Sequence, residues 1–150
     1  MNSLIKSLLL LLICCTCEAR LGDTVDQAKA RYGAAAADES SSGMRALAFV
    51  VGDYTVTCMF IGAGVCQGIQ YKRSSGTNPV PDDIKQAWLK ANAAGKAWKA
   101  IETSDFRREL WLREDGTRAI FDAFTRDMMI LTPTVMKMLQ ELREKEKSQF

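Results

Sequence analysis

The hydrophobic residues of the chain gather first in one unbroken block. Residues 8–15 are all apolar; they follow Lys6 and precede residues 17–19, which place small side chains at the −3 and −1 positions of a cleavage site. This order of positive charge, apolar block and small residues is typical of a secretory signal peptide. We therefore expect residues 1–19 to be removed, and residues 20–150 to form a single domain that is periplasmic or secreted.

Two other fates of the apolar block are disfavoured. The stretch from Ser7 to Cys17 is shorter than the ~20 residues that span a bilayer, so no stable membrane span is expected after cleavage. Lipid attachment would use Cys14, Cys15 or Cys17, and none of these follows the pair of small residues that lipoprotein processing prefers.

Beyond this block the pattern changes to helical periodicity. Thr24 and Gln27 have the form of a capping box, apolar residues then recur on one helical face, and Gly33 is a natural terminator. These features predict a helix over residues 24–32. Residues 34–43 are small, polar and featureless, and they predict a mobile connection.

Strand periodicity follows. Apolar runs at residues 47–51, 54–61 and 65–71 are separated by glycines, and the second run alternates apolar with polar side chains. Such a pattern predicts a three-stranded antiparallel meander with one buried face. Residues 74–81 are rich in turn formers and predict a linker.

A second helix is expected to begin near Pro81, where two aspartates complement the helix dipole. Its apolar spacing continues as far as Ile101, so the helix ends either near Asn92, which we favour, or at about Glu102.

More strands and a last helix complete the pattern. Strands are predicted at residues 109–114, 117–124 and 128–132, with an Asp-Gly hairpin turn between the first two. A last helix is predicted from Pro133, and it decays into a charged tail from Arg143.

Residues 23–72 and 82–132 thus share one layout, a short helix followed by about three antiparallel strands. The layout favours an α+β fold built as a tandem α-β-β-β repeat. We expect an antiparallel sheet with helices packed on one face, plus a C-terminal helix.

The opening of the domain resembles that of small exported proteins of the SmpA/OmlA (BamE-like) and β-lactamase-inhibitor-protein group. Gly22, Thr24, Gln27 and Gly33 stand in the arrangement of that group, in which a helix is followed by strands. The resemblance implies a binding or assembly protein whose sheet serves as a contact surface. This chain departs from the lipoprotein members because it lacks a convincing lipidation site, and it carries the unit twice, as the inhibitor proteins do.

Composition removes several kinds of chemistry. The chain has no histidine, which excludes Ser-His and Cys-His nucleophile pairs and zinc sites built on imidazole. No glycine loop precedes a helix to bind phosphate, and no cofactor is expected. The net charge is +2, and it stays +2 without Lys6 and Glu18, so a nucleic-acid partner is not expected.

Cys58 and Cys66 remain after signal cleavage. They form either a disulfide or two buried free thiols, depending on the register of the hairpin between them. A redox-active pair is disfavoured because no Cys-x-x-Cys helix start lowers either pKa.

The candidate binding surface joins two tryptophans with three basic residues near them. These are Trp98, Trp111, Lys96, Lys99 and Arg107. The simpler interpretation is that the tryptophans belong to the core and that the basic residues, interspersed with acidic ones, form a solvated face.

We therefore expect an exported, non-enzymatic domain that binds an unknown protein or envelope component through its sheet or loops. The alternatives are an envelope hydrolase that uses paired carboxylates and an envelope-assembly factor.

Overall fold

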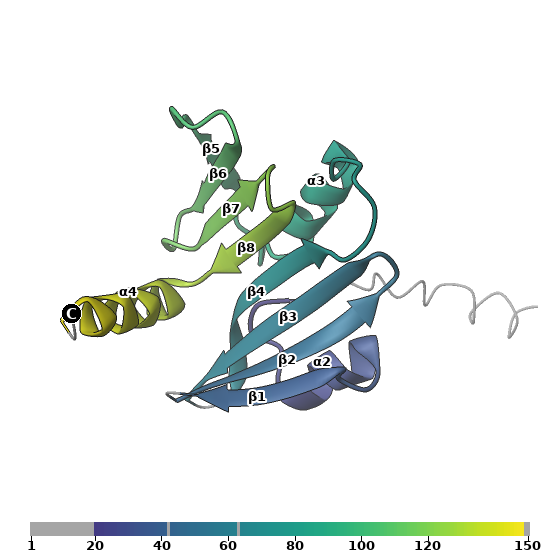
Figure 1. The fold of residues 1–150 in the computed structure, drawn as a ribbon, viewed down its shortest axis with the longest axis vertical. Coiled ribbons are helices and arrows are strands. Elements are labelled where there is room, and N and C mark those ends of the chain that lie inside the picture. Colours follow the sequence, from purple (N-terminus) through teal and green to yellow (C-terminus); the bar gives the residue numbers. More distant parts are fainter. Residues whose placement is uncertain (1–19, 42, 63, 149–150) are drawn as a thin grey trace, which may run out of the picture.

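A computed structural model describes residues 20–41, 43–62 and 64–148 (Figure 1). The predicted signal peptide lies outside the described residues. Eight strands form one antiparallel sheet in the order β1-β2-β3-β4-β8-β7-β6-β5. Among the described residues three helices accompany the sheet, which confirms the predicted α+β class. In the described part of the chain, no helix is both long enough and apolar enough to cross a membrane.

The sheet is built from two similar halves. The elements of the first half are α2 (Val25–Tyr32), β1 (Ala37–Ser41), β2 (Met44–Val51), β3 (Tyr54–Ile61) and β4 (Val65–Arg73). Those of the second half are α3 (Asp82–Ala91), β5 (Trp98–Ile101), β6 (Arg108–Arg113), β7 (Arg118–Asp122) and β8 (Asp127–Leu131). The C-terminal helix α4 covers Pro133–Lys147.

The strand order is a mirror image about the seam where β4 pairs with β8. Each half is a helix followed by a four-stranded meander, so β3 corresponds to β7, β2 to β6 and β1 to β5. The expected repeat is present, and its unit has four strands instead of three.

The extra strand in each half corrects the sequence interpretation. Residues 34–43, expected to be a mobile connection, contain β1, and β5 lies where no strand was expected. Both are edge strands, and all five residues of β1 are exposed. A strand that buries neither face needs no apolar alternation, so its sequence carries no period-two signal.

Helices α2 and α3 begin and end close to where their signals predict, whereas α4 continues to Lys147, past Arg143, where the charged tail was expected to begin. The Thr24 hydroxyl accepts a hydrogen bond from the Gln27 amide at 3.2 Å, and the Gln27 side chain accepts one from the Thr24 amide at 2.8 Å, which completes the capping box. Helix α3 ends at Ala91, so the alternative end at Glu102 is wrong. The side chain of Asn92, 2 % exposed, donates to the Trp88 carbonyl at 3.0 Å and closes the last turn.

The two sides of the sheet are covered differently. On the side that we call the inner face, Tyr32 of α2 contacts Phe49 with ring centroids 5.1 Å apart, and Trp88 of α3 stacks on Tyr71 at 4.6 Å. The first two helices therefore share one face, as expected. Helix α4 lies on the opposite, outer face, where buried Val135 packs against Met59 and Leu131.

Candidate binding surface

One row of residues crosses all eight strands on the outer face. Strand register places its members side by side, in the order Ala37, Ala48, Thr57, Gln70, Met129, Ile120, Leu110 and Ile101. The side chains of the first half are small or polar. Those of the second half are large and apolar, and we call Met129, Ile120, Leu110 and Ile101 the apolar row.

The apolar row is only partly covered. Leu110, Ile120 and Met129 are half-buried, and Ile101, on the edge strand, is 41 % exposed. Leu112 of β6 is also half-buried on the same face. A contiguous apolar surface on a sheet is a common feature of sites for protein partners.

A groove of about 450 Å³ separates this surface from α4. Its sheet side is formed by Ile120, Met129 and Leu131, and its helix side includes Met136 and Leu139. Figure 1 shows α4 leaving the end of β8 and extending beyond the sheet, so that it does not lie over β5 and β6. The groove therefore borders the apolar row, since Ile120 and Met129 line both.

The loops at one end of the second half expose two phenylalanines. Phe106 is 94 % exposed and Phe124 is 81 % exposed. The Ala123 amide donates to the Arg107 carbonyl at 2.8 Å and links the two loops. Phe106 directly precedes Arg107, and Phe124 directly follows Ala123. This end of the molecule, which we call the tip, therefore presents two aromatic rings on neighbouring loops.

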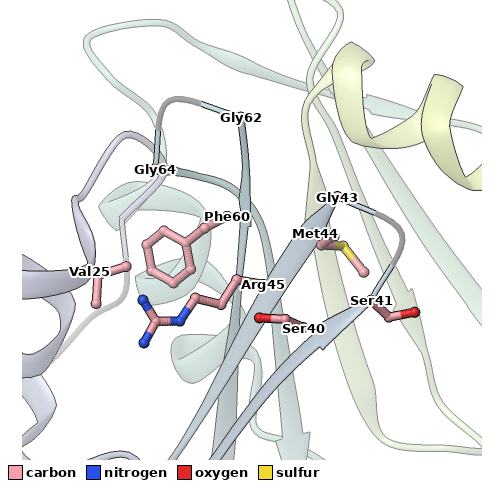
Figure 2. A pocket seen from close by; sticks show the side chains of 9 residues that line it. All are labelled: Val25, Ser40, Ser41, Gly43, Met44, Arg45, Phe60, Gly62 and Gly64. Carbon is pink, nitrogen blue, oxygen red and sulfur yellow. The ribbon is translucent and has the colours of Figure 1, made fainter.

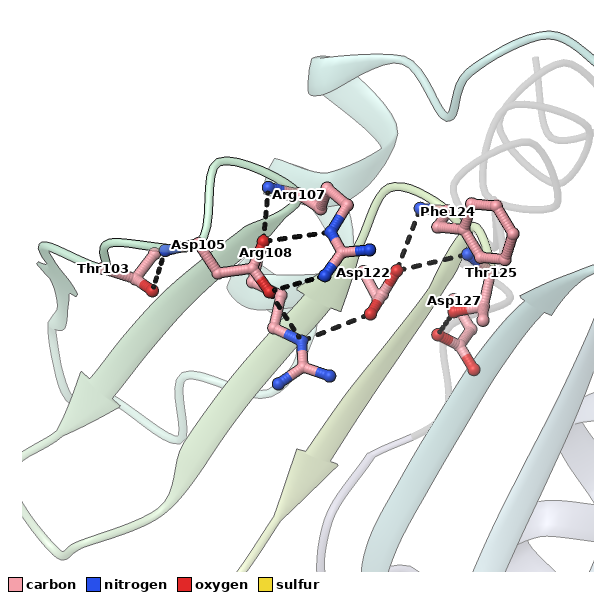
Figure 3. Close-up of polar contacts among 8 residues, drawn as sticks. All are labelled: Thr103, Asp105, Arg107, Arg108, Asp122, Phe124, Thr125 and Asp127. Carbon is pink, nitrogen blue, oxygen red and sulfur yellow. Dashed lines mark hydrogen bonds and ion pairs between the residues drawn. The ribbon is translucent and has the colours of Figure 1, made fainter.

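Aspartates hold the loops of the tip in place. Asp105 accepts hydrogen bonds from the amide and side chain of Arg107, and Asp122 accepts from the amides of Phe124 and Thr125. The Arg107 contact keeps the pKa of Asp105 below its usual range, and the amides of Thr125 and Phe124 do the same for Asp122. Figure 3 shows Arg108 between the two carboxylates, 3.7 and 3.3 Å from them.

The two tryptophans of the predicted surface lie on the inner face, next to α3. Trp98 is half-buried and donates its indole N–H to the Leu89 carbonyl at 2.7 Å, while Trp111 is 8 % exposed. The guanidinium of Arg113 lies 5.5 Å from the Trp98 ring. Both tryptophans line a shallow hollow of about 320 Å³ with Lys90.

The three predicted basic residues have different surroundings. Lys96 pairs with Glu114 at 3.0 Å, and Arg107 pairs with Asp105 at the tip. Lys99 faces outward beside Leu112. The structure thus brings Trp98 and Trp111 together on the inner face and places Lys99 and Arg107 elsewhere.

Cys58 and Cys66 are free thiols in this structure, and both are buried on the inner face. A bulge between Met59 and Phe60 pairs Cys66 with Phe60 and Cys58 with Ile69, so the two cysteines are diagonal neighbours. The contact with the Cys66 thiol, together with burial, raises the pKa of Cys58. Both thiols are therefore shielded from solvent, and the thiolate form of Cys58 is disfavoured.

A second hollow, of about 500 Å³, lies at the hairpin ends of the first half. Figure 2 shows Arg45 beside Phe60, reaching towards Val25. The guanidinium of Arg45 makes two hydrogen bonds with Asp38, at 2.9 and 2.7 Å, and this contact lowers the pKa of Asp38. The positive charge of Arg45 in this hollow is thus neutralised by Asp38 of β1.

Carboxylates and thiols do not converge as metal ligands within the described ranges. Instead, several of the acidic groups are held by arginines. Asp115, for example, receives two hydrogen bonds from the buried Arg113, at 2.9 and 2.7 Å.

Comparisons with known proteins add little to these observations. No family model matches the chain, and no curated protein matches it. Among solved structures it is similar to a cysteine-rich secretory protein of Staphylococcus aureus, with 7% identity and a TM-score of 0.44. The match covers 77% of this chain and 46% of the other, so the chain spans about half the length of that protein. This likeness supports no conclusion about function, and the resemblance to the BamE-like and inhibitor group stays a prediction.

Proposed function

We propose that the chain is an exported, non-enzymatic domain that binds another protein through the outer face of its second half. The apolar row is the observation that carries this proposal. Four large apolar side chains from four neighbouring strands, β5 to β8, lie in register on a face that α4 covers only in part. The exposed rings of Phe106 and Phe124 lie at the end of the same strands.

Three carboxylates of the second half are unsuited to the acid role in the alternative hydrolase. A glycosidase needs one carboxylic acid with a raised pKa, so that it can donate a proton near neutral pH. The pKa values of Asp105, Asp115 and Asp122 are instead lowered by hydrogen bonds, mainly from Arg107, from Arg113 and from the Thr125 amide respectively. These groups are ionised and are suited to holding loops.

Export is supported by the sequence of residues 1–19, which lie outside the described residues. Mass spectrometry of the protein recovered from outside the cytoplasm should find a chain that begins at Arg20 or within about two residues of it. Recovery of residues 1–10 intact on that material would contradict cleavage.

Photo-cross-linking in the producing cells tests the binding surface. A photoreactive amino acid replaces Ile101, and a second variant carries it at Ala37, the mirror position on β1. We expect a defined protein adduct from position 101 and none from position 37. Leu110→Asp should remove the adduct, because an unpaired carboxylate in the apolar row opposes burial. Equal adducts from both positions, or an adduct that Leu110→Asp leaves unchanged, would overturn the proposal.

A further inference from the structure

The partner can be described further from the size and charge of the uncovered surface, an inference that rests on the proposed function. Strands lie roughly 4.8 Å apart, so β5, β6 and β7 together present a surface roughly 10 Å wide between the outer strand axes. An α-helix with its side chains is about 10 Å across. The uncovered part of the outer face therefore has room for one helix beside α4.

Apolar side chains lie in the middle of this surface. Leu110 and Ile120 are directly paired across β6 and β7, and Ile101 pairs with Leu110 from β5. The groove continues the apolar surface to Met136 and Leu139 of α4. A partner helix would need an apolar stripe to contact it, as amphipathic helices in grooves do.

The charges at the border of this surface are mainly positive. Lys99 and Arg118 flank Leu112 in the strand register, while Arg143 and Lys147 line the groove from α4. None of these four cations makes an ion pair with a described residue. The acidic group that lines the groove is Glu144, which accepts a hydrogen bond from Gln140 at 3.1 Å.

We propose that the outer face of the second half binds an acidic amphipathic helix of a partner protein. Its apolar stripe lies on Leu110 and Ile120, and its carboxylates lie against Lys99 at the edge of the sheet and against Arg118 and Arg143 on the side of α4. Unpaired guanidinium groups at a border favour carboxylates, because each forms two parallel hydrogen bonds with a carboxylate. Charge complementarity of this kind selects among partners that all have an apolar stripe.

A pair of synthetic peptides tests this inference on the purified protein. The first is a capped peptide of about 18 residues, five helical turns, with leucines on one face and glutamates on the other. The second is identical except that lysine replaces every glutamate. Fluorescence anisotropy should show that the Leu-Glu peptide binds at least about tenfold more tightly than the Leu-Lys peptide, with a difference that shrinks as salt is added.

Charge reversal locates the binding. The double variant Arg118→Glu, Arg143→Glu should weaken binding of the Leu-Glu peptide about tenfold or more, since two attractive contacts become repulsive. Lys145→Glu is the matched control for the Arg143→Glu part of this variant: it makes the same charge change on α4 but lies on the side with Met138 and Leu142. This control should change the dissociation constant by less than about twofold.

The outcomes separate this inference from the proposed function. If both peptides bind equally and Leu110→Asp removes both, the apolar surface is a binding site and the acidic helix is wrong. If neither peptide binds, the helical partner is overturned, while cross-linking from position 101 still tests the surface. If the Leu-Glu peptide does not bind and vesicles of phosphatidylcholine with phosphatidylglycerol do, in a way that Arg118→Glu reduces, the surface serves a membrane and the inference is wrong.

Discussion

The two halves of the molecule use the same elements and cover them differently. Each is a helix and a four-stranded meander, and the two meet at the seam between β4 and β8. On the inner face both halves are buried, whereas on the outer face Ala48 and Thr57 correspond to Leu110 and Ile120. The inner face therefore accounts for the fold that the halves share. The outer face distinguishes them, and this difference locates the proposed binding surface in the second half.

The helices of the inner face differ as well. Helix α3 inserts Trp88, which is 6 % exposed, stacks on Tyr71 and meets Tyr54 edge to face at 5.2 Å. In α2 the fully buried side chain is that of Ala28. Helix α3 is thus anchored by a large buried aromatic ring against β3 and β4 of the first half, whereas α2 combines the close approach of Ala28 with the half-buried ring of Tyr32 on Phe49.

Removal of that anchor should give the largest effect on stability. Trp88→Ala should cost about 3–5 kcal/mol of unfolding free energy, because it leaves a cavity against Tyr71 and Tyr54. Ala28→Gly, the change in the other half, should cost about 1–2 kcal/mol through a lost methyl group and a more flexible helix. Denaturant unfolding followed by circular dichroism measures both, and equal midpoints for the two variants would contradict the comparison.

The comparison also explains what could be predicted from the sequence. The central strand β3 has an alternating apolar pattern, and α2 has a capping box at Thr24. Both are strong local signals, and both elements were predicted. The edge strands β1 and β5 occupy mirror positions, and both were missed. In β5 the spacing of Trp98 and Ile101 also fits a helix, so only pairing with β6 identifies it as a strand.

The candidate surface was predicted only in part, for a related reason. Burial of Trp98 and Trp111 depends on which face α3 covers, and a single strand does not specify that. A signal for the outer face was present: β6 places Leu110 and Leu112 on one face and Trp111 on the other, so both faces are apolar. The exposure of Phe106 and Phe124 depends on the direction of two loops, for which the sequence has no local signal.

The hairpin turns of the two halves also differ, and here we expect an intermediate effect on the free energy of unfolding. Between β6 and β7, Asp115 binds the guanidinium of Arg113, which is 5 % exposed and also donates to Thr117. Between β2 and β3, Asp53 is 64% exposed and lies 4.0 Å from Arg73. Removing Asp115 breaks two short hydrogen bonds to the buried guanidinium of Arg113, whereas Arg73 lies 4.0 Å from Asp53 and keeps its hydrogen bonds to the Asn78 and Pro79 carbonyls.

Asp115→Asn should therefore cost about 1–2 kcal/mol, a value reduced by solvent screening of the partly exposed carboxylate. Asp53→Asn should cost less than about 0.5 kcal/mol. The Arg113 contact lowers the pKa of folded Asp115, so its contribution is present above the unfolded pKa of about 4 and is lost as the pH falls below it. Unfolding titrations between about pH 2 and 7 should show a shallower loss of stability in Asp115→Asn than in the unaltered protein, and parallel curves would contradict this assignment.

The smallest expected effect concerns the cysteines, which distinguish the first half from the second. Cys58 and Cys66 are 2 % and 1 % exposed, so an alkylating reagent cannot reach them in the folded protein. Contact with the Cys66 thiol and burial raise the pKa of Cys58, so that its thiolate is not formed at neutral pH. Iodoacetamide should modify the folded protein at least about a hundredfold more slowly than the denatured chain, where both thiols titrate near pH 8.5.

Mass spectrometry after denaturation also separates the two states of Cys58 and Cys66 that the sequence left open, a disulfide and two free thiols. Two alkylated residues between Arg20 and Phe150 match the free thiols of the structure, while none before reduction identifies a disulfide. Rapid modification of one cysteine in the folded protein would show that the β3–β4 hairpin opens. The first half would then be the more mobile of the two, and the site of reactivity would have to be sought there.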